Sequence, residues 1–155
     1  MLSCINSSLV SYQYRTRYYW SNLEVTQPQD RCVSFQDYKE SNPEVLTKYK
    51  VRRTKYRETM WSEGRGRGRN QASYGCANVT HAQKIQCLTT KQDRCPNSGL
   101  IEYEDFCRYL TREELEAAQT IPLGYTQCLS YGQASKVLGN GWTVDVIAHI
   151  FQGLK

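Results

Sequence analysis

Apolar residues recur with a helical period mainly in the last third of the 155-residue chain. Thr111-Arg112-Glu113-Glu114 is a capping box, in which the Thr hydroxyl can accept a free N–H and Glu114 can reach back. Helix formers follow it until Pro122. A short helix is predicted over 131–138 and a tight turn over 139–141. From Thr143 onward, apolar residues at intervals of three and four predict an amphipathic helix: Val144, Ile147, Ala148, Ile150, Phe151 and Leu154.

The first two thirds of the chain have a different pattern. Residues 3–25 are apolar and aromatic, and the β-prone run Tyr18-Tyr19-Trp20 predicts a strand around 15–23. Residues 26–30 contain helix and strand breakers and are a plausible boundary. Residues 31–107 lack strong helical periodicity, and their short β-prone pieces at 85–88 and 100–103 indicate a loop-rich module. We therefore expect three regions, spanning 1–26, 27–107 and 108–155.

Positive charge is concentrated in one short segment. The chain has 20 basic and 15 acidic residues, a net charge of +5. Residues 48–69 hold nine basic and two acidic residues (+7), so the remainder has eleven and thirteen (-2). A localised basic patch is typical of a polyanion binder, although a solvated loop would also explain it. Two features favour nucleic acid as the polyanion. Aromatic side chains are interleaved with the basic ones, and the segment ends in an alternation of Gly and Arg that can lie along phosphates. The arginines of this alternation are Arg65, Arg67 and Arg69.

The composition argues against a membrane protein, a secreted protein and a metal-binding protein. No run approaches the roughly 18 apolar residues of a membrane helix, and the first residues lack the basic and apolar regions of a signal peptide. The seven cysteines are odd in number, none is spaced C-x-x-C, and there are two histidines. This pattern favours reduced thiols in a cytoplasmic protein and predicts neither a disulfide framework nor a metal site.

Three polar constellations could carry chemistry. In an extended strand, alternation would place Gln13, Arg15 and Arg17 on one face, where they could donate to a phosphate or a base carbonyl. The alternative is a polar face of an edge strand. The second constellation, 108–114, could also be a well-capped surface helix. The third, 139–144, combines glycines that allow close approach with the stacking plane of Trp142, or is a helix start with a packed Trp.

Taken in this order, the constellations resemble the C-terminal part of DNA (cytosine-5) methyltransferases, most closely the branch common in bacteria and their phages. Gln13-x-Arg15-x-Arg17 resembles that family's Q-x-R-x-R element. Arg108-x-Leu110-Thr111, with Glu113 or Glu114 and Gln119, resembles its next block, and Gly139-Asn140-Gly141-Trp142 its last. Cys87-Leu88-Thr89-Thr90 is similar to the T-L-T or T-L-S element of the recognition domain.

The resemblance implies a partial α/β fold, namely the C-terminal piece of a Rossmann-like methyltransferase with a loop-rich, mostly β target-recognition module at 27–107. Region 1–26 would supply a strand of the catalytic domain, and 108–155 would return to close the cofactor site. The resemblance implies a catalytic role beside the flipped cytosine for Gln13, Arg15 and Arg17. Asn140, Gly141 and Trp142 would contact S-adenosylmethionine. Double-stranded DNA would be contacted by Leu88, Thr89, Arg108, Arg65, Arg67 and Arg69.

The departures from the family are as informative as the matches. The glycine-rich cofactor loop, the Pro-Cys nucleophile loop and the Glu-Asn-Val acid block are absent. The family's chemistry needs that thiolate to attack C6 of a flipped cytosine. We therefore expect the chain alone to be inactive and to need a companion N-terminal methyltransferase segment. The alternatives are a non-catalytic nucleic-acid-binding protein and an inactive remnant.

Overall fold

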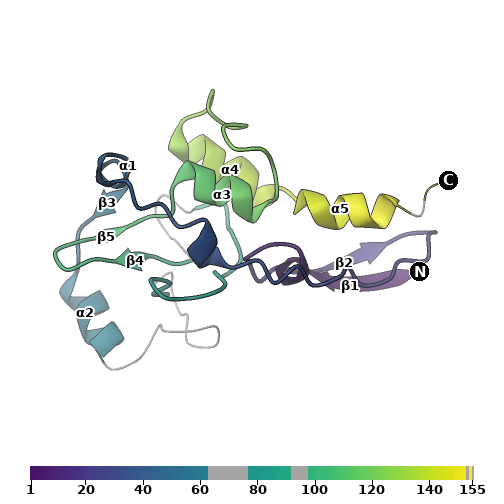
Figure 1. Cartoon of the computed structure of the whole chain (residues 1–155), viewed down its shortest axis with the longest axis horizontal. Coiled ribbons are helices and arrows are strands. Elements are labelled where there is room, and N and C mark those ends of the chain that lie inside the picture. The colour runs from purple at the N-terminus through teal and green to yellow at the C-terminus, as the bar shows by residue number, and fades with distance from the viewer. Residues whose placement is uncertain (63–76, 92–97, 153, 155) are drawn as a thin grey trace.

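The computed structural model describes residues 1–62, 77–91, 98–152 and 154, and shows a small α/β chain with short strands and helices. Figure 1 shows an elongated arrangement, with a β-hairpin and α5 at one end, and a small sheet and α2 at the other. The strands are β1 (Leu2–Asn6), β2 (Thr16–Trp20), β3 (Lys50–Val51), β4 (Ile101–Glu102) and β5 (Cys107–Arg108). The α-helices are α1 (Pro43–Thr47), α2 (Lys55–Ser62), α3 (Arg112–Ala118), α4 (Tyr131–Asn140) and α5 (Val144–Phe151). Two 3-10 helices span Ser7–Leu9 and Phe35–Asp37.

The predicted strand and the predicted last helix pack against each other. Strands β1 and β2 form an antiparallel hairpin in which Ile5 lies opposite Arg17. Helix α5 covers one face of this hairpin through a buried cluster that includes Ile5, Val146 and Ile150. The apolar face predicted for α5 is therefore confirmed, although the helix ends at Phe151, before Leu154.

The capped helices of the last third also form as predicted. Thr111 caps α3: its hydroxyl accepts from the Glu114 N–H at 3.2 Å, and the Glu114 carboxylate accepts from the Thr111 N–H at 2.7 Å. Helix α4 continues to Asn140, so most of the tight turn predicted over 139–141 is its last turn instead. Gly141 then caps α4 by donating its N–H to the Val137 carbonyl at 2.8 Å.

The loop-rich middle module contains two helices that periodicity does not reveal. Helix α1 starts at Pro43, and the side chain of Asn42 accepts from the Glu44 N–H. Helix α2 is held through Trp61, which is buried against Cys107 of β5 and against Leu100, the residue before β4. Strands β4 and β5 belong to the sheet with order β3-β5-β4. Local capping and one buried indole, rather than an apolar stripe, explain both helices.

The main core is shared by all three predicted regions. It contains Tyr12 from the first region, Phe35 and Ile85 from the second, and Leu115 and Ala134 from the third. Boundaries at 26/27 and 107/108 therefore do not divide this core into separate cores. Within the described part of the chain, no helix is long and apolar enough to cross a bilayer.

Candidate nucleic-acid and cofactor interface

Gln13 is fully buried and joins three distant parts of the chain. Its amide nitrogen donates to the Ala118 carbonyl at 2.5 Å and to the Gln119 side-chain oxygen at 3.0 Å, at the end of α3. Its amide oxygen accepts from the Leu88 N–H at 3.3 Å. Because buried amides are costly unless paired, these bonds fix the three segments relative to one another.

Thr143 belongs to the same buried network, which the sequence pattern did not reveal. It precedes α5, where a helix-capping hydroxyl is expected, yet it makes no side-chain cap. Instead its hydroxyl lies 2.7 Å from Ser7 Oγ and 3.1 Å from Gln119 Oε1. The start of α5 is thereby tied to the hairpin and to α3 by side chains rather than by a local cap.

Arg15 is only 4% exposed, and its guanidinium bridges two segments. One terminal nitrogen donates to the Leu88 carbonyl at 3.0 Å, and the other donates to the carbonyls of Gly139 at 3.1 Å and Gly141 at 2.8 Å. Gly139 allows the end of α4 to lie directly against the backbone of Thr89, because a Cβ at position 139 would be 2.3 Å from that backbone. Arg15 thus holds the end of α4 against the segment after Ile85.

Arg17 is the exposed member of the trio. One of its terminal nitrogens donates to the Thr16 carbonyl at 2.8 Å, and the other lies 3.6 Å from Cys87 Sγ. Arg15 reaches the same sulfur at 3.2 Å, so both guanidiniums face this segment, in line with the predicted alternation. However, the amide nitrogen of Gln13 and both terminal nitrogens of Arg15 donate to groups of the protein itself, and the Nε of Arg15 is buried without a partner among the described residues. Only Arg17 presents a guanidinium that an external ligand can reach.

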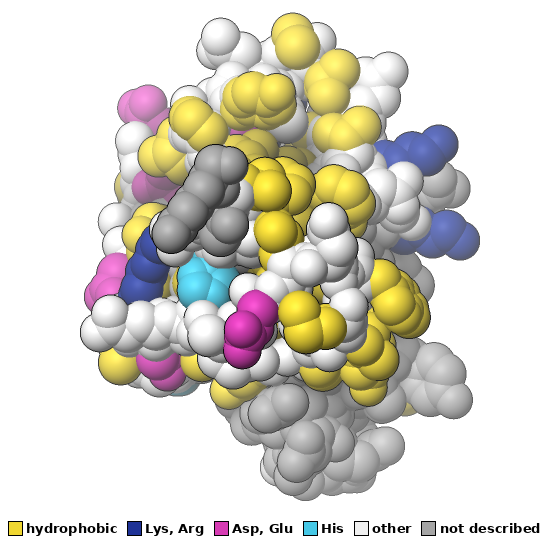
Figure 2. All heavy atoms as spheres, turned by 90° about the vertical axis from the view of Figure 1, so that its right-hand side faces the viewer, with side chains coloured by type: hydrophobic (Ala, Val, Ile, Leu, Met, Phe, Trp, Pro, Cys, Tyr) yellow, Lys and Arg dark blue, Asp and Glu magenta, His cyan; other side chains and the backbone are white. Residues whose placement is uncertain are grey.

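Trp142 stands between two hollows near the start of α5. It is 63% exposed. On one side, a cavity of about 350 Å³ is lined mostly by apolar side chains, including Ile121, Leu138 and Val144, with the backbone of Gly141. On the other side, a hollow of about 370 Å³ lies between β2 and α5. Figure 2 shows hydrophobic side chains gathered over this end of the molecule.

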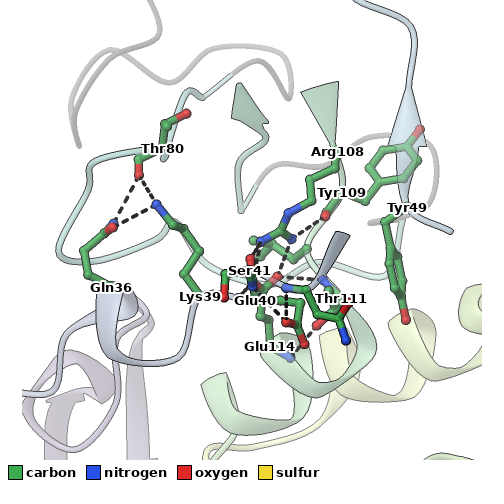
Figure 3. Close-up of polar contacts among 12 residues, drawn as sticks. Gln36, Lys39, Glu40, Ser41, Tyr49, Thr80, Arg108, Tyr109, Thr111 and Glu114 are labelled. Atoms are coloured by element: carbon green, nitrogen blue, oxygen red, sulfur yellow. Dashed lines mark hydrogen bonds and ion pairs between the residues drawn. The ribbon is translucent and has the colours of Figure 1, made fainter. Parts of the chain in front are cut away.

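The predicted DNA contact Arg108 lies in the interior. It is fully buried, and its two terminal nitrogens donate to the two Glu114 carboxylate oxygens at 2.7 and 2.8 Å (Figure 3). Further bonds reach the carbonyls of Tyr109 at 2.9 Å and Glu40 at 3.2 Å. Burial lowers the pKa of Arg108, but its hydrogen bond with Glu114, the negative charge of that carboxylate and a hydrogen bond with Tyr103 outweigh this and hold the pKa above its usual value. The structure therefore gives Arg108 internal partners in place of a phosphate.

The other residues predicted to bind DNA have different positions. Leu88 is buried and Thr89 is half-buried beside the trio. Arg65, Arg67 and Arg69 lie outside the described residues, so their role stays a prediction. Asn140, predicted to contact the cofactor, ends α4 and is exposed.

Part of the predicted basic segment is free to meet a polyanion. Arg53 is engaged, because it pairs with Glu58 at 3.3 Å and with Glu102 at 2.8 Å. Within the described part of this segment, four other cations are exposed and take part in no ion pair: Lys48, Lys50, Arg52 and Lys55. Lys50 lies over the ring of Phe106, whereas no ring contact among the described residues engages the other three. The exposed ring of Tyr56 follows them on α2. This surface lies around β3 and α2, at the opposite end of the molecule from α5 (Figure 1).

The described cysteines do not form a metal centre. Cys4, Cys32, Cys87, Cys107 and Cys128 are free. Over residues 1–62, 77–91, 98–152 and 154, no group of three or more Cys, His, Asp or Glu side chains is placed to hold a metal ion. Cys87 is still of interest, because the sequence identifies it only as the first residue of a motif similar to T-L-T, whereas its sulfur lies beside both arginines.

The fold is similar to part of two solved methyltransferase structures. The structure of the methyltransferase EhMeth of Entamoeba histolytica matches with a TM-score of 0.60 at 15% identity, covering 100% of this chain and 54% of that chain. The S. pombe Dnmt2 methyltransferase matches with a TM-score of 0.62 at 14% identity, covering 97% and 55%. The chain thus spans about half the length of these structures. No protein-family model and no curated protein matches its sequence.

Proposed function

We propose that this chain is the C-terminal portion of a DNA (cytosine-5) methyltransferase that uses S-adenosylmethionine and supplies target recognition and part of the cofactor pocket. The observation that carries the proposal is the buried polar network. In a chain with a methyltransferase fold, this network joins the Q-x-R-x-R element, through Gln13 and Arg15, to the other two elements of the resemblance. If the three elements were unrelated, we would not expect the buried hydrogen-bond donors of the Q-x-R-x-R element to bond to the other two elements.

The three residues of the Q-x-R-x-R element would divide the work. Gln13 and Arg15 would position the strand, because the amide nitrogen of Gln13 and the terminal nitrogens of Arg15 donate to internal carbonyls. Arg17 would contact the flipped cytosine or its phosphate, because its guanidinium is exposed beside them. A planar guanidinium can hold a carbonyl or a phosphate with two parallel hydrogen bonds, which suits recognition of a base held outside the helix.

The residues before α5 fit one wall of a site for S-adenosylmethionine. The apolar cavity beside Trp142 offers an indole plane for an adenine ring. Gly141 brings its backbone to the lining of the same cavity, and the exposed Asn140 precedes it at the end of α4. When bound, the cofactor would supply the methyl group. These residues would orient it and exclude water, and the opposite wall would come from the companion segment.

Catalysis is expected only in the presence of that companion. The sequence lacks the Pro-Cys loop and the acid block that the reaction requires. The purified chain, incubated with labelled S-adenosylmethionine and mixed-sequence DNA, should transfer no methyl group above background. Adding the polypeptide encoded immediately upstream of residue 1 should produce methylated cytosine, identified by mass spectrometry of nucleosides. Labelling by the chain alone, or none with the companion present, contradicts the proposal.

DNA binding through the exposed basic surface should depend strongly on salt. Each phosphate neutralised contributes about 0.9 to the slope of log K against log salt. Replacing Lys48, Arg52 and Lys55 by Ala should therefore flatten the slope by about 2.7 if each meets one phosphate. Lys136→Ala on α4 is the control for loss of an exposed charge. A slope that the triple variant leaves unchanged would exclude this surface from DNA.

The same surface supports the second candidate, a non-catalytic nucleic-acid-binding protein. Its exposed cations and the ring of Tyr56 combine charge with a stacking plane. The two candidates differ in their response to the cofactor. A methyltransferase half should bind DNA more tightly when the companion and S-adenosylmethionine are present, whereas a simple binder should show no such change.

A further inference from the structure

Strand β2 has an open edge. The hairpin sheet contains β1 and β2 alone among the described residues, so one side of β2 has no neighbouring strand. A two-stranded hairpin is marginally stable in water by itself. An aromatic edge strand is also a template for pairing with another strand. The open edge of β2 is therefore a place where further structure can add.

The alternation of hydrogen-bonded and non-hydrogen-bonded pairs in the hairpin shows which backbone groups of β2 face this open edge. Ser7 donates to the Arg15 carbonyl at 3.0 Å, and Ser21 donates to the Met1 carbonyl at 3.0 Å. In an antiparallel ladder, hydrogen-bonded pairs alternate with pairs whose N–H and C=O point outward. Within β2, Arg17 and Tyr19 therefore bond to β1. Tyr18 and Trp20 direct their N–H and C=O groups to the open edge.

A hollow of about 370 Å³ lies along the same edge. It is lined by β2 on one side and by Trp142 and α5 on the other, with Ile147, Ile150 and Phe151 contributing apolar side chains. No residue of β1 lines it. A strand laid beside β2 would thus gain backbone hydrogen bonds and an apolar contact with α5, as in recognition by β-strand addition.

The outer face of the hairpin is also uncovered. Because partners across an antiparallel pair share a face, Leu2 and Trp20 lie together, as do Cys4 and Tyr18. Trp20 is 79% exposed and Tyr18 is 61% exposed. The opposite face, which carries Ile5, is covered by α5. A sheet that is apolar on both faces is typical of an α/β fold with a layer on each side.

We propose that a strand of the companion methyltransferase segment pairs with the open edge of β2, and that the same segment covers the outer hairpin face. The inference rests on the proposed function for the identity of the occupant. It is supported by the matched methyltransferase structures, of which this chain spans 54% and 55%, so that each contains further structure of comparable size. A second copy is a poorer occupant, because each copy has a net charge of +5 and would bring another Arg17 to the edge.

Two variants at one position isolate the backbone contribution. Tyr18→Pro removes an N–H that points away from β1, so the hairpin ladder keeps its bonds. Tyr18→Val removes the same aromatic ring but keeps the N–H. The probe is the polypeptide encoded immediately upstream of residue 1, titrated against the full chain by calorimetry. Tyr18→Pro should weaken binding by about tenfold relative to Tyr18→Val, because it leaves a carbonyl of the companion unpaired.

Amide hydrogen exchange provides a second measurement on the unaltered chain. The amides of Tyr18 and Trp20 should exchange quickly in the free chain and slowly in the complex. Equal affinities of the two variants, or unprotected amides in the complex, would overturn the proposal. Failure of the probe to bind would overturn it too. Protection in the chain alone, with a dimer seen by light scattering, would assign the edge to a second copy and would equally overturn it.

The outcomes separate this inference from the proposed function. A complex that protects Tyr18 and Trp20 but does not methylate DNA supports the β2 interface and contradicts the methyltransferase assignment. Methyl transfer by a complex whose β2 amides stay unprotected supports the assignment and rejects this interface.

Discussion

Replacing Glu114 by Ala should lower the free energy of unfolding by about 3–5 kcal/mol, the cost of leaving a buried charge without its partner. The Glu114 side chain is 1% exposed, and the side chain of Arg108 is 0% exposed. The carboxylate also accepts from the backbone N–H groups of Thr111 at 2.7 Å and Glu40 at 2.8 Å. Its loss would leave a buried guanidinium without its counter-charge, and two backbone amides without their acceptor, at the junction of α3 and the middle module.

Urea unfolding followed by circular dichroism measures this effect. Glu113→Ala is the matched control, because Glu113 is also in the first turn of α3 but is exposed, and it should change stability by about 0.5 kcal/mol or less. The double change Arg108→Met with Glu114→Leu should recover much of the loss, because it removes both charges together. Equal effects of the two single glutamate variants would mean that the buried pair does not stabilise the fold.

The contrast between Glu113 and Glu114 shows which interactions a sequence pattern can predict and which it cannot. The Thr111–Glu114 capping box is readable because both partners lie within one turn of helix. The pair between Glu114 and Arg108 is not, because it depends on how β5 and α3 meet. A carboxylate that local pattern assigns to a cap is therefore also the centre of a buried network.

The same reasoning explains which elements were predicted. The caps and apolar spacing of α3, α4 and α5 are local signals, and the aromatic run of β2 is a strong β signal. Helices α1 and α2 were missed, because one is a single capped turn and the other depends on burial of Trp61. Non-local contacts decide such short elements, and a one-dimensional pattern does not contain them.

In the candidate site, too, some features were predicted from the sequence and others were not. Sequence spacing identified Gln13, Arg15 and Arg17 as a group, and all three side chains face the segment that contains Cys87 and Leu88. Spacing could not show that the first two are buried, because their acceptors are carbonyls more than 70 residues away. The two arginines, similar in the sequence, should therefore respond differently to the same substitution.

Arg15→Lys should destabilise the chain by about 2–4 kcal/mol, whereas Arg17→Lys should leave stability nearly unchanged. Arg15 bonds to the carbonyls of Leu88, Gly139 and Gly141 through a planar fork. An ammonium is a point charge on a flexible stem and cannot reproduce that geometry, so buried carbonyls would lose their donor. Arg17 is exposed and holds only a neighbouring carbonyl and the edge of Cys87.

Turnover of the chain complemented by its companion should separate the two residues further. Under the proposed function, Arg17→Lys should lower turnover on DNA at temperatures where the fold is intact, with cofactor affinity preserved, because the shape of the guanidinium is lost at the flipped base. Arg15→Lys should lose activity in parallel with the fraction unfolded and recover it on cooling. If Arg17→Lys unfolds the chain while Arg15→Lys is silent in the unfolding curves, the division between positioning and contact is reversed. If neither changes stability or turnover, the buried network is not what brings the three elements together.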